Sequence, residues 1–396
     1  MISRIFIPVI LMLVLPDIYF ELHYLRYRKS YSGWRRLLWW MPSIIMLSYT
    51  IGLVSIHNFV PTDIRWLYVY LLLIGVLFVP KAVFALSSFL GWRHCVFHHT
   101  HKNWGNPVGG ILSLITVLAF LYGLVIGPRT FKVRHLDIYL DHLPKAFDGY
   151  KIVHFSDAHV GTFNYSFDRY LRRDIDSIEA QHADLIVFTG DLQNLQPGEL
   201  KMHENWYREL GHQKKSLMVS VMGNHDYSDY YRGTPAEMAS RVRQMEKLQR
   251  SFGWKLLLNE NEIIRRGKSS IYLAGGEYEN SKTDTLNYVN RTKMYEGIPQ
   301  GAFVIELQHN PIHWEQNIAP EKGRILPQLT LSGHTHGGQI SIFGIRPTML
   351  FYNEDYGLYE KNDKYIYVTS GIGGLVPFRL GSTPEIAVIT LHCFKR

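Results

Sequence analysis

Hydrophobic residues are unevenly distributed along this chain of 396 residues. The first part of the chain contains four long apolar runs, whereas the remainder alternates short apolar stretches with charged ones. A membrane-spanning helix needs about 20 predominantly apolar residues. The pattern therefore predicts about four transmembrane helices in residues 1–129 and a second domain in residues 130–396. The runs extend roughly from Ile5 to Phe20, Leu37 to Ile56, Leu67 to Leu86 and Ile111 to Ile126.

Each run has a competing interpretation. The first could be a cleaved signal peptide, but it contains Pro16 and Asp17 instead of a small-residue cleavage site, and further runs follow it. The other three could form the core of a soluble helical domain. Aromatic residues near the run ends favour the membrane, because their rings settle at its interface. These residues are Trp39, Trp40, Trp66, Tyr68 and Tyr70.

Positive charge predicts the orientation of the helices, because cytoplasmic loops carry an excess of Lys and Arg. Loop one contains Arg26, Arg28, Lys29, Arg35 and Arg36, loop three contains Arg93 and Lys102, and loop two offers only Arg65. Loops one and three are therefore predicted to be inside and the second domain extracytoplasmic, in a protein of the bacterial inner membrane. Three cations after the last run argue for the opposite orientation; they are Arg129, Lys132 and Arg134.

Charge and cysteine content exclude other classes of protein. The net charge of +8 lies largely in loops beside the predicted helices, and no base-reading module is present, so no nucleic acid is expected as a partner. A basic surface at a membrane suits an anionic lipid. Cys95 and Cys393 are expected to be free thiols. Asp17 and Lys81 are isolated charges, which gives a channel or transporter no support.

In the second domain, apolar runs of strand length alternate with amphipathic stretches such as Phe167 to His182 and Pro235 to Ser251, which predicts an α/β fold. Five of these runs end in polar clusters: KIVHFSDAH, ADLIVFTGD, SLMVSVMGNHD, AFVIELQHNP and QLTLSGHTHGG. Ligands bind beyond the carboxyl ends of strands in such sheets. We therefore expect seven side chains to converge there: Asp157, His159, Asp191, Asn224, His309, His334 and His336.

The chemistry of these side chains indicates a metal site. One such cluster alone would be weak, because short polar motifs commonly bond their own backbone. Together they supply imidazole nitrogens with carboxylate and amide oxygens and no thiolate, which suits divalent Mn, Fe or Zn. Two such ions, roughly 3.5 to 4 Å apart, can clamp the attacking and leaving oxygens of a phosphoryl group.

The motifs DAH, GDLQN, GNHD, QHNP and GHTHGG resemble those of the calcineurin-like metallophosphoesterases, in particular their membrane-attached bacterial branch. The resemblance extends roughly from Leu136 to Leu391. It implies a four-layer α/β/β/α sandwich with two divalent metal ions and a metal-bound hydroxide as nucleophile. The first ion would be held by Asp157, His159, Asp191 and His336, and the second by Asp191, Asn224, His309 and His334.

Two further residues follow from the resemblance. His225 would stabilise the phosphate or protonate the leaving oxygen. Asp226 would either orient His225 and keep it protonated or stabilise a turn. One departure concerns the residues after Asp191, where many relatives carry an acidic residue followed by Arg and this chain has LQNL. This puts kinship with the protein serine/threonine phosphatases in doubt.

The sequence therefore predicts a membrane-anchored phosphohydrolase acting on a phosphomonoester or phosphodiester, with a lipid-linked or membrane-proximal substrate. A UDP-diacylglucosamine-type pyrophosphatase is one alternative, although it would favour a cytoplasmic site. A metal-binding scaffold without activity is another.

Several other residues have open roles. Tyr227, Tyr230 and Tyr231 either line the substrate cleft or pack on the rim, and the segment from Glu277 to Tyr295 is either a lid or a membrane-docking loop. His154 and His313 are expected to be packing or surface residues. Four further histidines lie in one tract that could bind metal but is expected to be an interfacial or cytoplasmic loop: His94, His98, His99 and His101.

Overall fold

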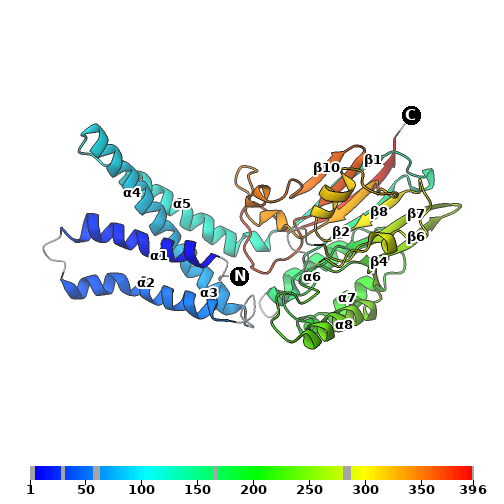
Figure 1. The fold of residues 1–396 in the computed structure, drawn as a ribbon, viewed down its shortest axis with the longest axis horizontal. Coiled ribbons are helices and arrows are strands. Elements are labelled where there is room, and N and C mark those ends of the chain that lie inside the picture. Colours follow the sequence, from blue (N-terminus) through cyan, green and yellow to red (C-terminus); the bar gives the residue numbers. More distant parts are fainter. Residues whose placement is uncertain (1–4, 28–31, 57–62, 164–166, 280–286, 395–396) are drawn as a thin grey trace. The chain divides into compact units, whose positions relative to one another are not determined.

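The computed structural model describes residues 5–27, 32–56, 63–163, 167–279 and 287–394 (Figure 1). Loop-one cations Arg28 and Lys29 and part of the segment from Glu277 to Tyr295 lie outside these ranges. The chain divides into two compact units, Met1–Val125 and Ile126–Arg396.

The first unit contains the predicted membrane helices. Four helical segments are long and apolar enough to cross a bilayer: Phe6–Leu25, Gly33–Val54, Arg65–His98 and Gly105–Arg129. They comprise α1 (Phe6–Phe20) with a π-turn (Glu21–Leu25), α2 (Gly33–Val54), α3 (Arg65–Leu73) continued by a π-turn (Ile74–Phe78) into α4 (Val79–His98), and α5 (Gly105–Val125). Large apolar side chains such as Ile7, Ile45 and Leu114 are exposed on these helices, as a lipid-facing surface requires. The prediction of four membrane helices is confirmed.

A polar cluster lies in the middle of this unit. Ser43 donates to one carboxylate oxygen of Asp17, and Lys81 forms an ion pair with the other. Asp17 and Ser43 are fully buried. The three side chains come from α1, α2 and α4, close to the midpoint of each span. Describing Asp17 and Lys81 as isolated charges is therefore wrong, because helix packing joins residues that are 64 positions apart.

Each member of this cluster directly follows a proline within its helix: Pro16, Pro42 and Pro80. A proline removes one backbone hydrogen bond from a helix, and in a membrane the freed carbonyl needs another donor. The freed carbonyl belongs to the residue four positions before the proline, whereas the carbonyl of Pro80 itself accepts from the hydroxyl of Ser113 on α5 at 2.7 Å. Polar side chains thus tie all the membrane helices together near their centres.

The second unit contains two mixed sheets of six strands each. The first runs in the order β1 (Lys132–Leu140), β12 (Glu385–Cys393), β2 (Tyr150–Phe155), β3 (Leu185–Phe188), β4 (Leu217–Ser220), β5 (Lys255–Leu256). The second runs in the order β10 (Gly357–Lys361), β11 (Lys364–Val368), β9 (Leu329–Ser332), β8 (Val304–Leu307), β7 (Ser269–Gly275), β6 (Glu260–Arg266).

Helices cover the outer faces of the two sheets. Figure 1 shows α6 (Asp168–Glu179), α7 (Glu204–Gly211) and α8 (Pro235–Ser251) grouped beside the first sheet, where they share a core with its outward side chains. The outer face of the second sheet is covered by shorter elements, α9 (Arg291–Met294) and a π-turn (Trp314–Ile318). A continuous apolar core that includes Ile152, Val187 and Leu331 lies between the sheets. The four-layer α/β/β/α prediction is confirmed.

Local sequence explains where the outer helix α8 begins. At α8, the hydroxyl of Thr234 accepts from the backbone N–H of Glu237 and the Glu237 carboxylate accepts in return from Thr234. Such a capping box, followed by a proline in the first turn, fixes a helix start. The predicted helix from Pro235 to Ser251 has the observed bounds. The predicted helix from Phe167 to His182 is observed only over Asp168–Glu179, and His182 beyond its end adopts a positive φ of 49°.

Candidate metal centre

Strand register brings the predicted ligands to one edge of the fold. Strands β2, β3 and β4 are parallel and end in register, with Phe155 opposite Phe188 and Phe188 opposite Ser220. Strands β8 and β9 are also parallel neighbours, and the last residue of β8, Leu307, lies opposite Leu331, one residue before the end of β9. The loops that follow these five strands carry all seven predicted ligands. The expectation that they converge beyond the strand ends therefore agrees with the strand order.

The backbone is unusual at these ligands. Five of them adopt a positive φ, a conformation that residues other than glycine rarely occupy: Asp157 (52°), His159 (46°), Asp191 (64°), His334 (73°) and His336 (54°). Each such residue costs on the order of 1 kcal/mol or more, and clusters of them occur at functional sites. The left-handed turns direct the side chains out of the strand direction toward a common centre.

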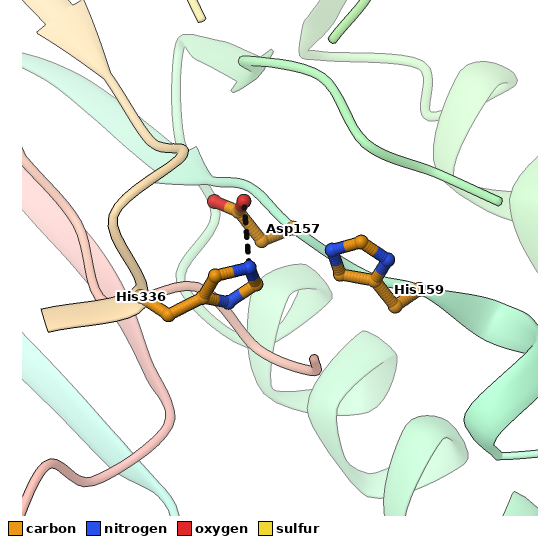
Figure 2. Close-up of side chains that lie close together, drawn as sticks. All are labelled: Asp157, His159 and His336. Carbon is orange, nitrogen blue, oxygen red and sulfur yellow. Dashed lines mark ion pairs between the residues drawn. The ribbon is translucent and has the colours of Figure 1, made fainter. Parts of the chain in front are cut away.

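The first group of ligands consists of Asp157, His159 and His336, whose ligand atoms all lie within 4.8 Å of one another. Figure 2 shows the two rings beside the carboxylate, and Nε2 of His336 lies 3.5 Å from the Asp157 carboxylate. The backbone N–H of His334 donates to both oxygens of Asp157, at 3.2 and 3.1 Å. The last histidine motif is thereby fixed against the first aspartate.

The second group consists of Asp191, His309 and His334. Nε2 of His309 lies 3.2 Å from the Asp191 carboxylate, 3.1 Å from the Asn224 amide oxygen and 3.2 Å from Nδ1 of His334. Asp191 also lies 3.6 Å from Nε2 of His159, which belongs to the first group. Asp191 is therefore positioned between the two groups, as the resemblance implies for a bridging ligand.

Buried ring nitrogens without partners test whether these residues fit metal ions. Nε2 of His159 and Nδ1 of His336 are buried and have no hydrogen-bond partner among the described residues. At His159 the other ring nitrogen lies 3.3 Å from the side-chain amide of Asn194, so the unpartnered nitrogen faces the cluster. Leaving a buried polar atom unpaired is costly. A divalent cation in the cluster would satisfy Nε2 of His159, and the nitrogen and oxygen donor set fits Mn, Fe or Zn.

The pKa values of the cluster also favour a cation. Burial, followed by the nearby His225, lowers the pKa of His159 to about 3, so its ring is neutral and offers a lone pair. Burial raises the pKa of Asp157 to about 6. At His309 burial would lower the pKa, but the Asp191 carboxylate outweighs it and raises the pKa to about 9. The space between Asp191 and His309 thus favours positive charge.

His225 lies beside both groups and is held from several sides. Its Nδ1 donates to the backbone carbonyl of Asn194 at 2.6 Å, and its backbone N–H donates to Asp191 at 2.8 Å. The ring packs on Tyr230 and His159, with centroids 4.3 and 4.7 Å apart. Burial lowers the pKa of His225. The Asn194 carbonyl fixes the proton on Nδ1 and leaves Nε2 as the nitrogen for chemistry.

Asp226 has a different set of contacts from those expected of a partner for His225. Its carboxylate accepts from the backbone N–H groups of Asp191, Leu192, Gln193 and Gly223, at 2.8, 2.9, 3.3 and 3.0 Å. These bonds tie the loop after β3 to the loop after β4. The geometry favours the turn-stabilising alternative for Asp226, whereas orientation of His225 comes from the backbone of Asn194.

Sequence reasoning missed several residues that hold the ligands. The carbonyl of Thr189 accepts from Nδ1 of His309 at 2.6 Å, and the hydroxyl of Tyr352 lies 3.1 Å from Nε2 of His334. Arg379 is buried and donates to the carbonyl of His336 at 2.8 Å. The LQNL departure after Asp191 was a usable signal, because it contains Asn194. Carbonyl acceptors carry no signal in the sequence.

The remaining sequence candidates have defined places. Tyr230 receives a hydrogen bond from Asn224 at 3.1 Å and lies at the site, whereas Tyr227 is buried against Tyr288, and Tyr231 stacks with Arg241. His154 is a buried packing residue bonded to Thr189, as expected. The surface alternative for His313 is wrong, since this ring is buried between Glu279 and Glu306. Among the described residues, the metal-compatible groups do not include the tract from His94 to His101.

Comparison with known proteins agrees with this architecture. Residues 150–338 match a family model for calcineurin-like phosphoesterases, and residues 3–128 match one described as a probable calcineurin-like phosphoesterase transmembrane domain. The chain is 31% identical over 280 residues to the uncharacterized metallophosphoesterase YkuE of Bacillus subtilis, covering 68% of this chain and 88% of that protein. It is 28% identical to a transmembrane protein with metallophosphoesterase domain of Danio rerio, covering 70% of this chain and 61% of that one.

Among solved structures, the phosphopantetheinyl hydrolase of Mycobacterium tuberculosis aligns with 55% of this chain and 88% of its own at 9% identity. Its TM-score of 0.31 is too low to support an argument.

Proposed function

The chain belongs to the calcineurin-like phosphoesterase family, and we propose that it is a membrane-anchored phosphohydrolase with a binuclear metal centre. The observation that carries this proposal is the pair of ligand groups joined at Asp191, with buried ring nitrogens that lack partners. Asp157, His159 and His336 would hold one ion, Asn224, His309 and His334 the other, and Asp191 would bridge them. Mn, Fe and Zn all suit this donor set.

Two divalent ions supply Lewis-acid chemistry, since they draw charge from phosphate oxygens and make water more acidic. The residues of the chain would do the rest. His225 would present Nε2 to the leaving oxygen and transfer a proton there, which general acid catalysis requires. The bond from Nδ1 to the Asn194 carbonyl leaves Nε2 to carry a second proton, so the acid would be the imidazolium form of His225.

The loops around the ligands would fix these groups relative to one another. Asp226 joins the loops that carry Asp191 and Asn224 through four backbone hydrogen bonds. Tyr230 packs on the His225 ring and Tyr352 contacts His334, so both would limit the motion of the imidazoles when a phosphate binds. Groups that are already in place stabilise a transition state more than groups that must first reorient.

We propose that the membrane unit anchors the enzyme in the bacterial inner membrane, with loops one and three inside and the catalytic unit outside. This side of the membrane follows from the cations Arg26, Arg35 and Arg36 at loop one and Arg93 and Lys102 around loop three. A UDP-diacylglucosamine-type substrate would require the opposite orientation. Protease accessibility of the catalytic unit in intact cells distinguishes the two.

The test of the proposed activity is hydrolysis by the detergent-purified full chain. The protein is treated with a chelator and then assayed with p-nitrophenyl phosphate and bis-p-nitrophenyl phosphate, before and after addition of Mn, Zn or Fe. We expect activity to depend on added metal and to be lost in Asp191→Asn. The matched control is Asp176→Asn, because among the described residues this exposed carboxylate pairs only with Arg172 on the same helix. Activity of Asp191→Asn equal to that of the parent would reject the binuclear site. A wild type without activity on any phosphate ester would favour the scaffold alternative.

A further inference from the structure

One loop of the catalytic unit exposes far more apolar surface than a soluble domain ordinarily does. We call residues 342–351 the apolar loop. Six of its ten residues are large, apolar and more than half exposed: Ile342 (52%), Phe343 (101%), Ile345 (72%), Met349 (52%), Leu350 (82%) and Phe351 (62%). Contiguous exposed apolar patches mark protein or membrane interaction sites.

The exposed position of these side chains is built into the backbone. Ile342 and Ile345 exchange two backbone hydrogen bonds, both 3.0 Å long, around a two-residue turn. Phe343 and Gly344 form this turn with φ of 51° and 82°. Such a turn normally carries Asn or Gly at its first position. A phenylalanine in this strained conformation projects an apolar ring from the tip of a hairpin.

The second half of the apolar loop is anchored at its base. Arg346 donates to both carboxylate oxygens of Asp355, at 2.6 and 2.8 Å, and the hydroxyl of Thr348 donates to the same carboxylate at 2.7 Å. Between these anchors, Pro347 begins a short 3-10 helix (Pro347–Leu350). Met349 and Leu350 are therefore displayed from a turn whose polar side chains are directed toward the domain.

The apolar loop is attached to the metal centre at both ends. It follows His336 in the chain and directly precedes Tyr352, whose hydroxyl lies 3.1 Å from Nε2 of His334. The hydroxyl of Thr335, between the two last histidines, donates to the carbonyl of Asp355 at 2.6 Å. A surface that binds this loop is therefore held next to the candidate ligands.

The length of the connection to the membrane favours a bilayer over other partners. Only residues 126–131 separate α5, which ends at Val125, from β1, which begins at Lys132. A chain of six residues reaches at most about 20 Å, so the catalytic unit cannot leave the membrane surface. The backbone N–H and C=O groups of Ile342 and Ile345 pair with one another below the tip, which lowers the cost of insertion into lipid.

We propose that the apolar loop inserts into the bilayer surface and holds the metal centre against phosphate groups carried by membrane lipids. This inference rests on the proposed phosphohydrolase function and names its substrate class, a phosphate ester of a lipid presented in a bilayer. Phe343 and Leu350 enter the membrane interface, where burial of their apolar surface stabilises the docked state.

Spin labels test the insertion directly. Phe343→Cys and Leu217→Cys are introduced separately into the full chain that carries Cys95→Ser and Cys393→Ser. Each variant is spin-labelled and reconstituted in nanodiscs of phosphatidylcholine and phosphatidylglycerol. Leu217 is the matched control, because it is 38% exposed and begins β4 at the end of the strand opposite the site. We expect the label at 343 to be relaxed by lipid-soluble oxygen and the label at 217 by a water-soluble nickel chelate. A label at 343 that is accessible mainly to the chelate overturns the proposal, as does one shielded from both reagents by a second copy of the chain.

Activity measurements separate this inference from the proposed function. For Phe343→Ser and Leu350→Ser we expect hydrolysis of bis-p-nitrophenyl phosphate to remain within about twofold of the parent, because these exposed side chains contribute little to folding. Hydrolysis of phosphatidic acid or phosphatidylglycerol in vesicles should fall roughly tenfold or more in the variants. Equal rates on vesicles for the parent and variants overturn the role of the loop while leaving the phosphohydrolase intact. Absence of hydrolysis by the parent on every ester refutes the proposed function instead, whatever the depth of the label.

Discussion

Both units of this chain bury ionisable side chains, but these side chains differ in whether their polar atoms have partners. In the membrane unit, each carboxylate oxygen of Asp17 has a partner, one from Ser43 and one from Lys81. At the edge of the sheets, two histidine ring nitrogens are buried with no partner among the described residues. The backbone around the second cluster is also held in left-handed conformations, at a cost in folding free energy.

The difference separates a cluster that is complete from one that requires a ligand. Buried polar groups in folded proteins are almost always paired, so the Asp17 cluster explains itself by joining helices. Under the proposed function, the cluster around Asp191 would be completed by bound metal ions. Four substitutions test this distinction, in order of decreasing expected effect.

The largest effect is expected for His159→Ala. Removal of a ring that would coordinate metal should lower phosphoesterase activity by roughly a thousandfold, the scale seen when a central electrostatic group is removed. The metal-free protein should lose only the packing and the Nδ1 contact of this buried ring, because Nε2 of His159 has no hydrogen-bond partner among the described residues. Bound metal and thermal unfolding are measured together after chelation and reloading. The surface variant His392→Gln is the control. Unchanged metal content in His159→Ala would place the histidine outside the site.

In the membrane unit, Lys81→Met is expected to lower stability and to leave activity in place. This change leaves the Asp17 carboxylate buried without its cation, which costs roughly 3–5 kcal/mol. Unfolding in mixed micelles with increasing sodium dodecyl sulfate measures the loss, and activity on soluble esters should persist wherever the protein stays folded. The double variant Asp17→Asn/Lys81→Met should recover much of the stability, whereas Ser48→Ala, at an exposed helix position, should be neutral. A double variant no better than the single one would contradict the pairing.

An intermediate effect is expected for Asp226→Asn. The amide replaces one oxygen acceptor with a donor that faces backbone N–H groups, so the catalytic unit should lose about 2 kcal/mol of stability. If Asp226 acts only on the turn, the pH dependence of kcat should keep its shape in this variant. A shift of the acidic or basic limb of the kcat–pH profile would instead support the alternative in which Asp226 controls the proton of His225.

The smallest effect concerns His313, a histidine whose charge is already compensated. Burial lowers its pKa, but Glu306 and Glu279 outweigh burial and raise the pKa above the ordinary 6.5. A histidine with a raised folded pKa stabilises the protein fully below pH 6.5 and loses this contribution as the pH rises through the folded value. The free energy of unfolding, measured by thermal unfolding, should therefore decline above pH 6.5 by on the order of 1 kcal/mol. The decline should be shallower in His313→Gln, and identical pH profiles would contradict the ion pairing.

Hydrophobic periodicity along the chain was sufficient to predict the elements of both units. Four runs of span length predicted the membrane helices, and alternating short runs predicted the α/β domain. The start of α8 has a local cause in Thr234, Pro235 and Glu237, because capping depends on residues within one turn. The seven candidate ligands could also be named from the sequence, since each follows the end of an apolar strand.

Only the tertiary structure decided which groups meet across long distances in the chain. The pairing of Asp17 with Lys81 depends on how α1 and α4 pack, and the bond from His225 to Asn194 depends on the register of neighbouring strands. The sequence did not separate the two roles of Asp226, because an aspartate beside a histidine looks the same whether it bonds the ring or the backbone. Nor did it reveal the apolar loop, since its pattern resembles a buried strand until folding leaves it exposed. Local periodicity reports which residues prefer burial, whereas partners and exposure depend on contacts that form only when the whole domain is assembled.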